Sequence, residues 1–284
     1  MRSRTSPGWH DLRNYACLVA CFAFFPVQAV AAEPTANPSL TKTWVFDAGA
    51  VFQNLDGGAT ADLNRGGGGS VGFSQIGLDE RSTSPFLAAR WRFTDRWRFD
   101  FTFDSVIVDG NRTVSRDIDF GFISVPASAS ADSSLKARNY SGFLGYSFVK
   151  DEKSELGGRF GLTIMDAEFS LRGTASAFGQ TSSTGRQKAE VVGPIPTLGF
   201  YGTYALSNRW TVDGSIDGLA GHLGAYSGHY LAASANLTYW INDTFAVAVG
   251  YRYVDGKLEH EGSVMRKAVE IQYSGPVVKA SVGF

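Results

Sequence analysis

The sequence has very little cysteine, and both of its cysteines lie near the N-terminus. Cys17 and Cys21 fall within the first 32 of 284 residues, and the rest of the chain contains none. A disulfide framework and a cysteine-based metal site are therefore excluded for residues 33–284. Charged residues are also sparse, at 19%, and a formal net charge of -1 leaves no excess of basic residues for nucleic-acid binding. We expect no nucleic-acid partner, no cofactor and no bound metal.

The N-terminal 32 residues have the pattern of a cleaved signal peptide. A region containing three arginines precedes an apolar stretch at 15–30, and small residues at 29–32 offer a cleavage site. An N-terminal membrane anchor is the alternative, but the apolar stretch is shorter than the roughly 20 residues of a spanning helix. Acylation of Cys21 is a second alternative, which the apolar residues following it disfavour. The predicted organisation is a signal peptide at 1–32, a short periplasmic segment at 33–42 and one domain at 43–284.

Long apolar runs are absent after the signal peptide, and alternation with period two takes their place. Between Trp97 and Phe103 the odd positions are aromatic and the even positions polar, and between Phe245 and Tyr253 the odd positions are large and apolar. This is the pattern of strands with one apolar face. The same pattern predicts ten strands, at 43–53, 84–93, 97–110, 136–149, 155–171, 192–206, 209–221, 229–241, 244–257 and 266–284.

The connections between these strands alternate in length. Those at 94–96, 150–154, 207–208 and 242–243 are short, whereas those at 54–83, 111–135, 172–191, 222–228 and 258–265 are mostly long. Short periplasmic turns and long extracellular loops are typical of a transmembrane antiparallel up-and-down β-barrel. We therefore predict an all-β barrel of about ten strands, with eight as the alternative. The apolar parity switches near 165–167 and at 275–276, which indicates bulges or points where a strand leaves the membrane.

Aromatic residues and the C-terminus support the same prediction. The five tryptophans that follow residue 32 fall at the ends of strands beside the short turns or at the start of the first strand, where a barrel has its interfacial girdle. The chain ends on Phe284, which shares one face with Val282 and Val278 and is typical of an assembly signal in a final strand. The predicted periplasmic girdle consists of Trp44, Trp91, Trp97, Trp210 and Trp240.

Five short segments, mostly turns and strand ends, lie at 76–79, 86–96, 132–136, 145–155 and 196–199. They resemble a family of uncharacterised outer-membrane β-barrel proteins of Gram-negative bacteria, related in form to the OmpA-type membrane domain, and the resemblance covers about residues 43–284. It implies a location in the outer membrane, with contacts to lipids, lipopolysaccharide and the barrel-assembly machinery. It implies no catalytic residue. We expect a monomer.

Placing the apolar parity against lipid places a set of charged residues in the lumen. The interior of a barrel this narrow is just wide enough to be filled by side chains, and buried charges must pair or stay hydrated. We therefore predict a salt-bridge network that plugs the lumen, with a narrow channel for ions or small solutes as the alternative. The network consists of Asp47, Arg90, Arg92, Arg98, Asp100, Asp104, Arg159, Asp213, Asp217, Arg252 and Lys279.

An outer-membrane hydrolase is the third hypothesis for this chain. A protease of this class would activate water with acidic residues and a histidine at the extracellular lip, for which the nearest candidates are Asp213, Asp217 and His222, with His229 and His260 on other strands. The spacing contains no paired aspartates, and a serine nucleophile with His222 matches no motif. We expect a structural or surface-interaction protein rather than an enzyme.

Overall fold

The computed structural model describes residues 36–284 except 65, 67, 79, 116, 121–122, 178–179 and 224–225; the predicted signal peptide lies outside the described residues. Ten long strands account for most of the described chain. They are β1 (Trp44–Leu63), β3 (Arg81–Arg92), β4 (Trp97–Thr113), β7 (Ser130–Lys150), β8 (Ser154–Ala177), β9 (Gln180–Ala205), β10 (Trp210–Leu223), β11 (Tyr226–Trp240), β12 (Phe245–Glu261) and β13 (Met265–Gly283). Shorter elements are α1 (Pro38–Thr41), β2 (Gly68–Gly72), the 3₁₀ helix η4 (Phe73–Ile76), β5 (Ile118–Phe120) and β6 (Ile123–Val125).

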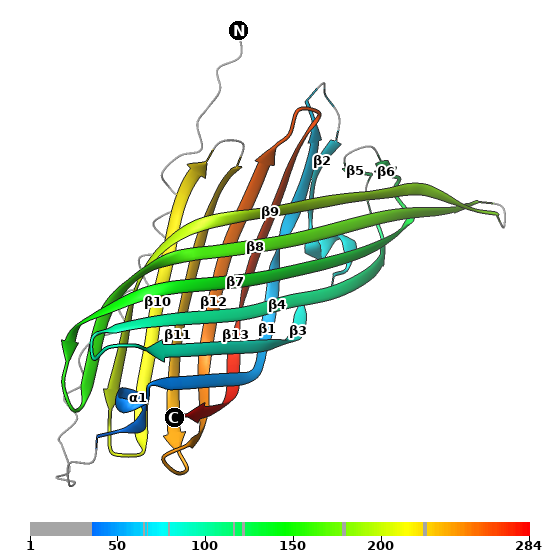
Figure 1. Ribbon diagram of the computed structural model, residues 1–284. Coiled ribbons are helices and arrows are strands. Elements are labelled where there is room, and N and C mark those ends of the chain that lie inside the picture. The colour runs from blue at the N-terminus through cyan, green and yellow to red at the C-terminus, as the bar shows by residue number, and fades with distance from the viewer. Residues whose placement is uncertain are drawn as a thin grey trace. The chain divides into compact units, whose positions relative to one another are not determined.

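The ten long strands form an antiparallel ring (Figure 1). Each strand pairs with the next in chain order, and β1 pairs with β13 from Val45 opposite Gly283 to Leu63 opposite Met265. The ring pairs the backbone groups of its strands within the protein, which is the condition for crossing hydrocarbon. The prediction of ten strands is therefore confirmed, and the alternative of eight is wrong. Among the described residues, no helix is both long and apolar enough to cross a bilayer.

Four short turns, at 93–96, 151–153, 206–209 and 241–244, define one end of the barrel, which we call the turn end. A short polar side chain closes each turn by accepting backbone N–H groups two or three residues later: Thr94, Asp151, Ser207 and Asn242. Hydrogen bonds from Ser154 and the Lys153 backbone hold the pKa of the Asp151 carboxyl below its usual value. The predicted short connections are thus locally encoded.

The opposite end, which we call the hairpin end, differs from the sequence prediction. The predicted loops at 172–191, 222–228 and 258–265 are for the most part strand, because β8 and β9 continue to Ala177 and Gln180, and β10 to β13 extend similarly. The apolar alternation fades in these segments, and this loss led to the wrong prediction of loops. Among the described residues at this end, separate elements occur in the connections from β1 to β3 and from β4 to β7, namely β2 with η4 and β5 with β6.

The inward and outward faces exchange character along β8 and β12. On β12, Val247, Val249 and Tyr251 face outward toward the turn end, whereas Val254 and Leu258 are buried inside toward the hairpin end. On β8 the outward series of Leu162 and Ile164 gives way to buried Met165, Ala167 and Phe169 in the same regular register. The parity switch near 165–167 is therefore not a bulge, since the register shift of β8 against β9 lies at Gly173 and Thr174.

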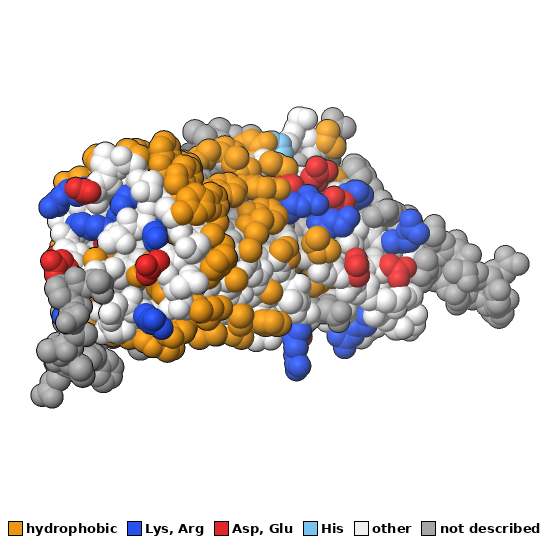
Figure 2. Space-filling view, turned by 60° about the horizontal axis from the view of Figure 1, so that its bottom comes forward, with side chains coloured by type: hydrophobic (Ala, Val, Ile, Leu, Met, Phe, Trp, Pro, Cys, Tyr) orange, Lys and Arg blue, Asp and Glu red, His pale blue; other side chains and the backbone are white. Residues whose placement is uncertain are grey.

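The outward apolar side chains form a belt around the half of the barrel nearer the turn end. Figure 2 shows this band on one face, with charged side chains on both sides of it. Outward-facing Phe160, Phe200 and Val249 are more than half exposed, at 54, 62 and 56%. Large apolar side chains exposed in a continuous band are the outer surface of a membrane barrel.

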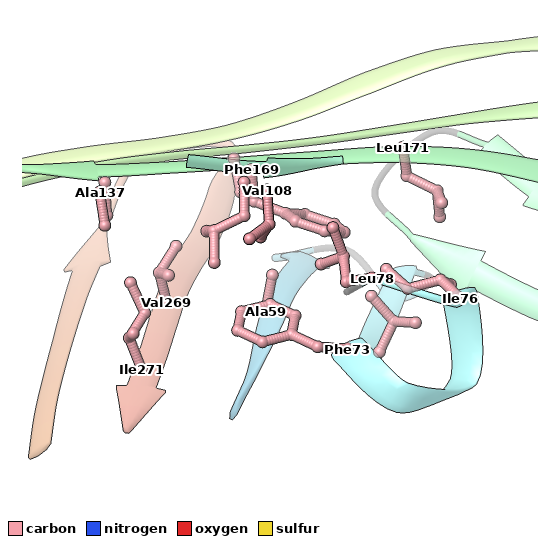
Figure 3. Packing of buried hydrophobic residues seen from close by; sticks show 14 of the residues in the cluster. Ala59, Phe73, Ile76, Leu78, Val108, Ala137, Phe169, Leu171, Val269 and Ile271 are labelled. Carbon is pink, nitrogen blue, oxygen red and sulfur yellow. The ribbon is translucent and has the colours of Figure 1, made fainter. Parts of the chain in front are cut away.

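The half nearer the hairpin end has an apolar core instead of a polar lumen. Phe73, Ile76 and Leu78 of the β2–β3 connection point between the strands and meet Val108, Phe169 and Ile271 (Figure 3). Phe169 contacts Phe73 and Phe120, with ring centroids 5.9 and 5.3 Å apart. The connection segments thus fold into the barrel and fill it. This half is packed like a soluble β-sandwich, in which opposed sheets enclose side chains.

Prolines mark the points where the ring opens into two sheets. The ladder between β8 and β9 continues past Pro194 and Pro196, but the ladder between β9 and β10 stops at Leu198. Likewise, Pro85 pairs with β1, whereas pairing of β3 with β4 begins only at Phe86. Because proline has no N–H, a sheet accepts it only where its nitrogen faces away from a ladder. The prolines therefore limit ring closure to the half that carries the belt.

Candidate functional site in the barrel interior

The eleven charged residues predicted to line the lumen all have buried or half-buried positions in the half enclosed by the belt. They come from β1, β3, β4, β8, β10, β12 and β13, and the alternation of each strand turns them inward. Most are joined by ion pairs across strands, whereas Asp213 is held by neutral groups only among the described residues.

Asp100 is the centre of this arrangement, because three arginines converge on its carboxylate. Arg98 donates from Nε to Oδ2 at 2.9 Å, Arg159 lies 3.2 Å from the same oxygen, and Arg90 Nε lies 3.5 Å from Oδ1. Arg159 also donates from Nε to Asp217 at 2.6 Å. Arg90 and Asp100 lie directly opposite each other on β3 and β4, and this pairing brings their side chains together.

Glu155, which the sequence analysis missed, holds a second centre nearer the turn end. Its side chain is fully buried and receives two hydrogen bonds from Arg92, at 2.9 and 2.8 Å, and one from Lys150 at 3.0 Å. Ser147 donates a further hydrogen bond, and Arg98 lies 3.5 Å away. A bidentate arginine pair with this geometry is among the stronger charge-assisted contacts in proteins. Glu155 therefore joins the turn end to Asp100 through Arg98.

The remaining lumen charges form smaller groups. Arg252 donates to Asp104 at 2.7 Å, and Asp104 also receives hydrogen bonds from Asn139 and Tyr273. Lys279 pairs with Asp47 at 3.2 Å. Asp213 accepts from Asn236 and Thr238 of the neighbouring strand.

Aromatic rings and glycines shape the space around the arginines. The guanidinium of Arg98 stacks over the ring of Tyr201 at 3.3 Å, and that of Arg159 lies over Phe143 at 4.5 Å. A Cβ at Gly157 would overlap the Tyr201 ring, and one at Gly199 would overlap the Asp217 carboxylate. Glycine at these positions therefore leaves room for the stacked ring and for the Asp217–Arg159 pair.

The helix α1 occupies the interior at the turn end. Asn37 caps it by accepting from the Ser39 backbone and donates from Nδ2 to the Ser207 carbonyl at 2.8 Å. Lys150 donates to the Leu40 carbonyl at 2.7 Å, and Asn37 and Leu40 are buried. The described part of the predicted periplasmic segment 33–42 is thus packed into the barrel.

Trp240 belongs to this plug and not to the girdle. It is 2% exposed, and its Nε1 donates to Ser39 Oγ at 2.7 Å. The prediction for Trp240 is wrong because Asn236, Thr238 and Trp240 share the inward face of β11, while Tyr239 faces outward. The other predicted girdle residues lie on the outer surface: Trp91, Trp97 and Trp210 are exposed, and Trp44 stacks on Trp91 at 5.2 Å.

Phe284 lies beside the first strand. Its backbone exchanges two hydrogen bonds with Trp44, and its ring lies 5.8 Å from that of Phe46 on the outer surface. The structure thus places the last residue next to the seam where the ring closes. Its role in assembly stays a prediction.

A cavity of about 100 Å³ lies in the middle of the polar interior. Arg90, Arg98, Arg159, Arg252 and Lys279 line it, together with Asp47, Asp100, Asp213 and Asp217. A cavity of this size holds a few water molecules or one small ligand. The charged lining makes it the candidate functional site of the barrel.

The residues considered for hydrolysis have separate partners. Asp217 pairs with Arg159, and Asp213 is bound by Asn236 and Thr238. His229 lies 3.4 Å from Asp255, and the His260 ring stacks on Tyr226. The side chain of His222 lies outside the described residues. Within the described chain, no three His, Cys, Asp or Glu residues are grouped to hold a metal ion.

Comparisons with known proteins give likenesses of structure. No protein-family model matches the chain, and no curated protein sequence matches it. The outer membrane protease OmpT from Escherichia coli aligns with a TM-score of 0.54 and 13% identity, over 90% of this chain and 99% of that one. OprG from Pseudomonas aeruginosa aligns at 0.35 with 12% identity, over 86% and 97%, and the toluene transporter TodX from P. putida at 0.34 with 12%, over 85% and 90%.

The likeness to OmpT at this identity shows a shared barrel fold and nothing of activity. Together with the ten-strand ring, the outward apolar belt and the inward charges, it identifies this chain as an integral outer-membrane β-barrel. The predicted fold class and outer-membrane location are confirmed.

Proposed function

We propose that this barrel is a structural or surface-interaction protein whose lumen is closed to solutes. The observation that carries the proposal is the filling of the interior at three successive levels. The plug formed by α1 and Trp240 occupies the turn end, the charge network occupies the belt level, and the apolar core occupies the hairpin end.

Each level is closed by a different kind of contact. At the turn end, buried Asn37, Ser39 and Leu40 are held by strands β7, β10 and β11 and the turn before β10. At the belt level, arginines stack on aromatic rings and share carboxylates, which leaves a cavity of about 100 Å³. At the hairpin end, Phe73 and Ile76 fill the space between strands. A hydrated solute would have to displace all three.

The outer surface supports contacts with lipid and lipopolysaccharide. The belt ends at Tyr140 and Ile164, and the next outward residues toward the hairpin end are Arg138 and Asp166, which pair at 3.3 Å. A second outward pair, Lys188 with Glu168, follows at 2.6 Å. Charges of both signs above an apolar belt suit the phosphates and bridging cations of lipopolysaccharide. These contacts and a monomeric state are part of the proposal.

A narrow channel is the second candidate. The cavity is lined by inward-facing charged side chains, which could form part of a path for ions, and α1, which closes the turn end, is a segment of only four residues. An outer-membrane hydrolase is the third. Hydrolysis of lipopolysaccharide or peptide by the purified barrel, lost on replacing His222, would support it.

Conductance in planar bilayers tests the closed lumen. We expect the folded protein to give no reproducible openings under conditions in which a general porin conducts. Defined openings whose size or ion selectivity changes in Arg98→Gln or Asp100→Asn would overturn the proposal and establish the channel. Replacement of the outward-facing Arg138 by Gln is the matched control, since it leaves the interior unchanged.

A further inference from the structure

The ion pairs around Asp100 and Glu155 do not balance. Their connected contacts join five cationic side chains to three carboxylates, an excess of two positive charges. Asp213 lines the cavity of the polar interior without a cationic partner among the described ion pairs, and its carboxylate offsets one of the two. The cations are Arg90, Arg92, Arg98, Arg159 and Lys150, and the carboxylates are Asp100, Glu155 and Asp217. Lys150 lies at the turn end, but the four arginines cannot lose their charge by deprotonation.

Hydrogen bonding is incomplete at the same arginines. Arg90 makes a single 3.5 Å ion pair with Asp100, a carboxylate already occupied by Arg98 and Arg159. Among the described residues, Arg90 Nε and Arg98 Nη1 are buried and make no hydrogen bond, although each lies 3.5 Å from a carboxylate oxygen, of Asp100 and of Glu155 respectively. Guanidinium N–H groups that lack a hydrogen bond at this depth favour a further acceptor.

The cavity supplies the space for that acceptor. It is lined by Arg90, Arg98 and Arg159, and its whole lining carries five cationic and four acidic side chains. The acidic ones have donors of their own: Asp47 has Lys279, Asp217 has Arg159, and Asp213 has Asn236 and Thr238. The lining groups that lack a hydrogen bond are therefore donors, while the Asp213 carboxylate is held by neutral groups.

We propose that the cavity binds a small monovalent anion of halide size between Arg90 and Arg98. A monatomic anion accepts hydrogen bonds from several directions, so it can meet both guanidinium groups while leaving Asp100 in place. The remaining volume holds water, which connects the anion to the polar side chains of β10 and β11. The site exists whether or not the lumen conducts, so it does not depend on the proposed function.

Bromide provides the test, because it has the charge of chloride and scatters anomalously. The full-length folded protein is crystallised with sodium bromide as the only salt. We expect one anomalous peak in the cavity, within hydrogen-bond distance of Arg90 and Arg98, that is lost in Arg90→Gln and kept in the control Arg138→Gln. A cavity with ordered water and no anomalous peak in the unmodified protein overturns the proposal.

A second measurement covers the case in which Arg90→Gln fails to fold. The midpoint of urea unfolding of the unmodified protein is compared in sodium chloride and sodium gluconate at equal ionic strength, since gluconate is too large for the cavity. We expect a higher midpoint in chloride that rises to saturation with concentration, as binding to the folded state requires. Equal midpoints at every concentration contradict a bound halide.

Discussion

Trp240 donates a hydrogen bond to Ser39, 201 residues earlier in the chain, and this bond fastens the N-terminal segment inside the barrel. Ser39 Oγ lies 2.9 Å from Thr211 Oγ1 as well, so one hydroxyl joins α1 to both β10 and β11. The last residue of β11 thus binds a segment that precedes the first strand in the chain and lies inside the barrel.

Trp240→Phe removes the indole donor and keeps most of the apolar volume. A net hydrogen bond contributes about 1 kcal/mol, so we expect the barrel to stay folded while the N-terminal segment loosens. Limited proteolysis of the detergent-solubilised protein should cut residues 33–42 several-fold faster than in the unmodified protein. Trp210→Phe, on the outer surface, should leave the rate unchanged; equal rates in all three proteins would contradict the plug.

Glu155→Gln leaves Arg92, Arg98 and Lys150 around a neutral side chain. Breaking a buried ion pair by removing one partner costs about 3–5 kcal/mol, and we expect a loss of unfolding free energy in this range. Urea titration in detergent measures it. Glu152→Gln in the exposed turn three residues earlier is the control, with an expected change under about 0.5 kcal/mol. A loss for Glu155 no larger than for Glu152 would refute the assigned role.

The position of the belt predicts that the free-energy cost of an outward-facing arginine depends on its depth in the membrane. Val249→Arg places a charge on the lipid face, where the cost is about 2–4 kcal/mol, whereas Glu261→Arg, at an exposed position on the same face of β12 beyond the belt, should cost about 0–1 kcal/mol. Reversible unfolding from phospholipid vesicles measures both. Equal costs at the two positions would contradict the placement of the membrane.

Phe169→Ala tests the apolar core at the hairpin end. The ring is fully buried against Phe73 and Phe120, and its removal should cost about 3–5 kcal/mol. Glu168→Ala, one residue earlier on the outward face, loses an exposed pair with Lys188 worth about 0–1 kcal/mol. Urea unfolding in detergent measures the loss of unfolding free energy in each variant. A comparable loss for the two would mean that the half nearer the hairpin end has no packed core.

Much of the barrel follows from the sequence because alternation and turn chemistry are local. The ten strands and the inward position of charges such as Asp100 and Arg159 could be predicted from parity alone. Parity also places Glu155 with Gly157 and Arg159, and Trp240 with Thr238, on the inward face. Each of the two residues adjoins a short turn, and for Trp240 the inward face prevails over the position at the strand end.

The rest depends on contacts between segments distant in the chain. Phe73 and Ile76 lie in a glycine-rich connection without periodicity, and only the surrounding strands make their burial favourable. The entry of Ser39 into the barrel likewise needs partners more than 170 residues away. The excess of arginine over carboxylate becomes visible only when individual distances assign the partners.

The prolines of β9 have a consequence for the crowded surface on which such barrels reside. Beyond Leu198 no described strand pairs with the β10 side of β9, and unpaired strand edges recruit strands from neighbouring molecules. Pro194 and Pro196 remove two N–H groups from that edge, so a strand from a second copy finds fewer donors there. The two prolines thus make this edge of the long β8–β9 hairpin a poorer template for a strand from another molecule.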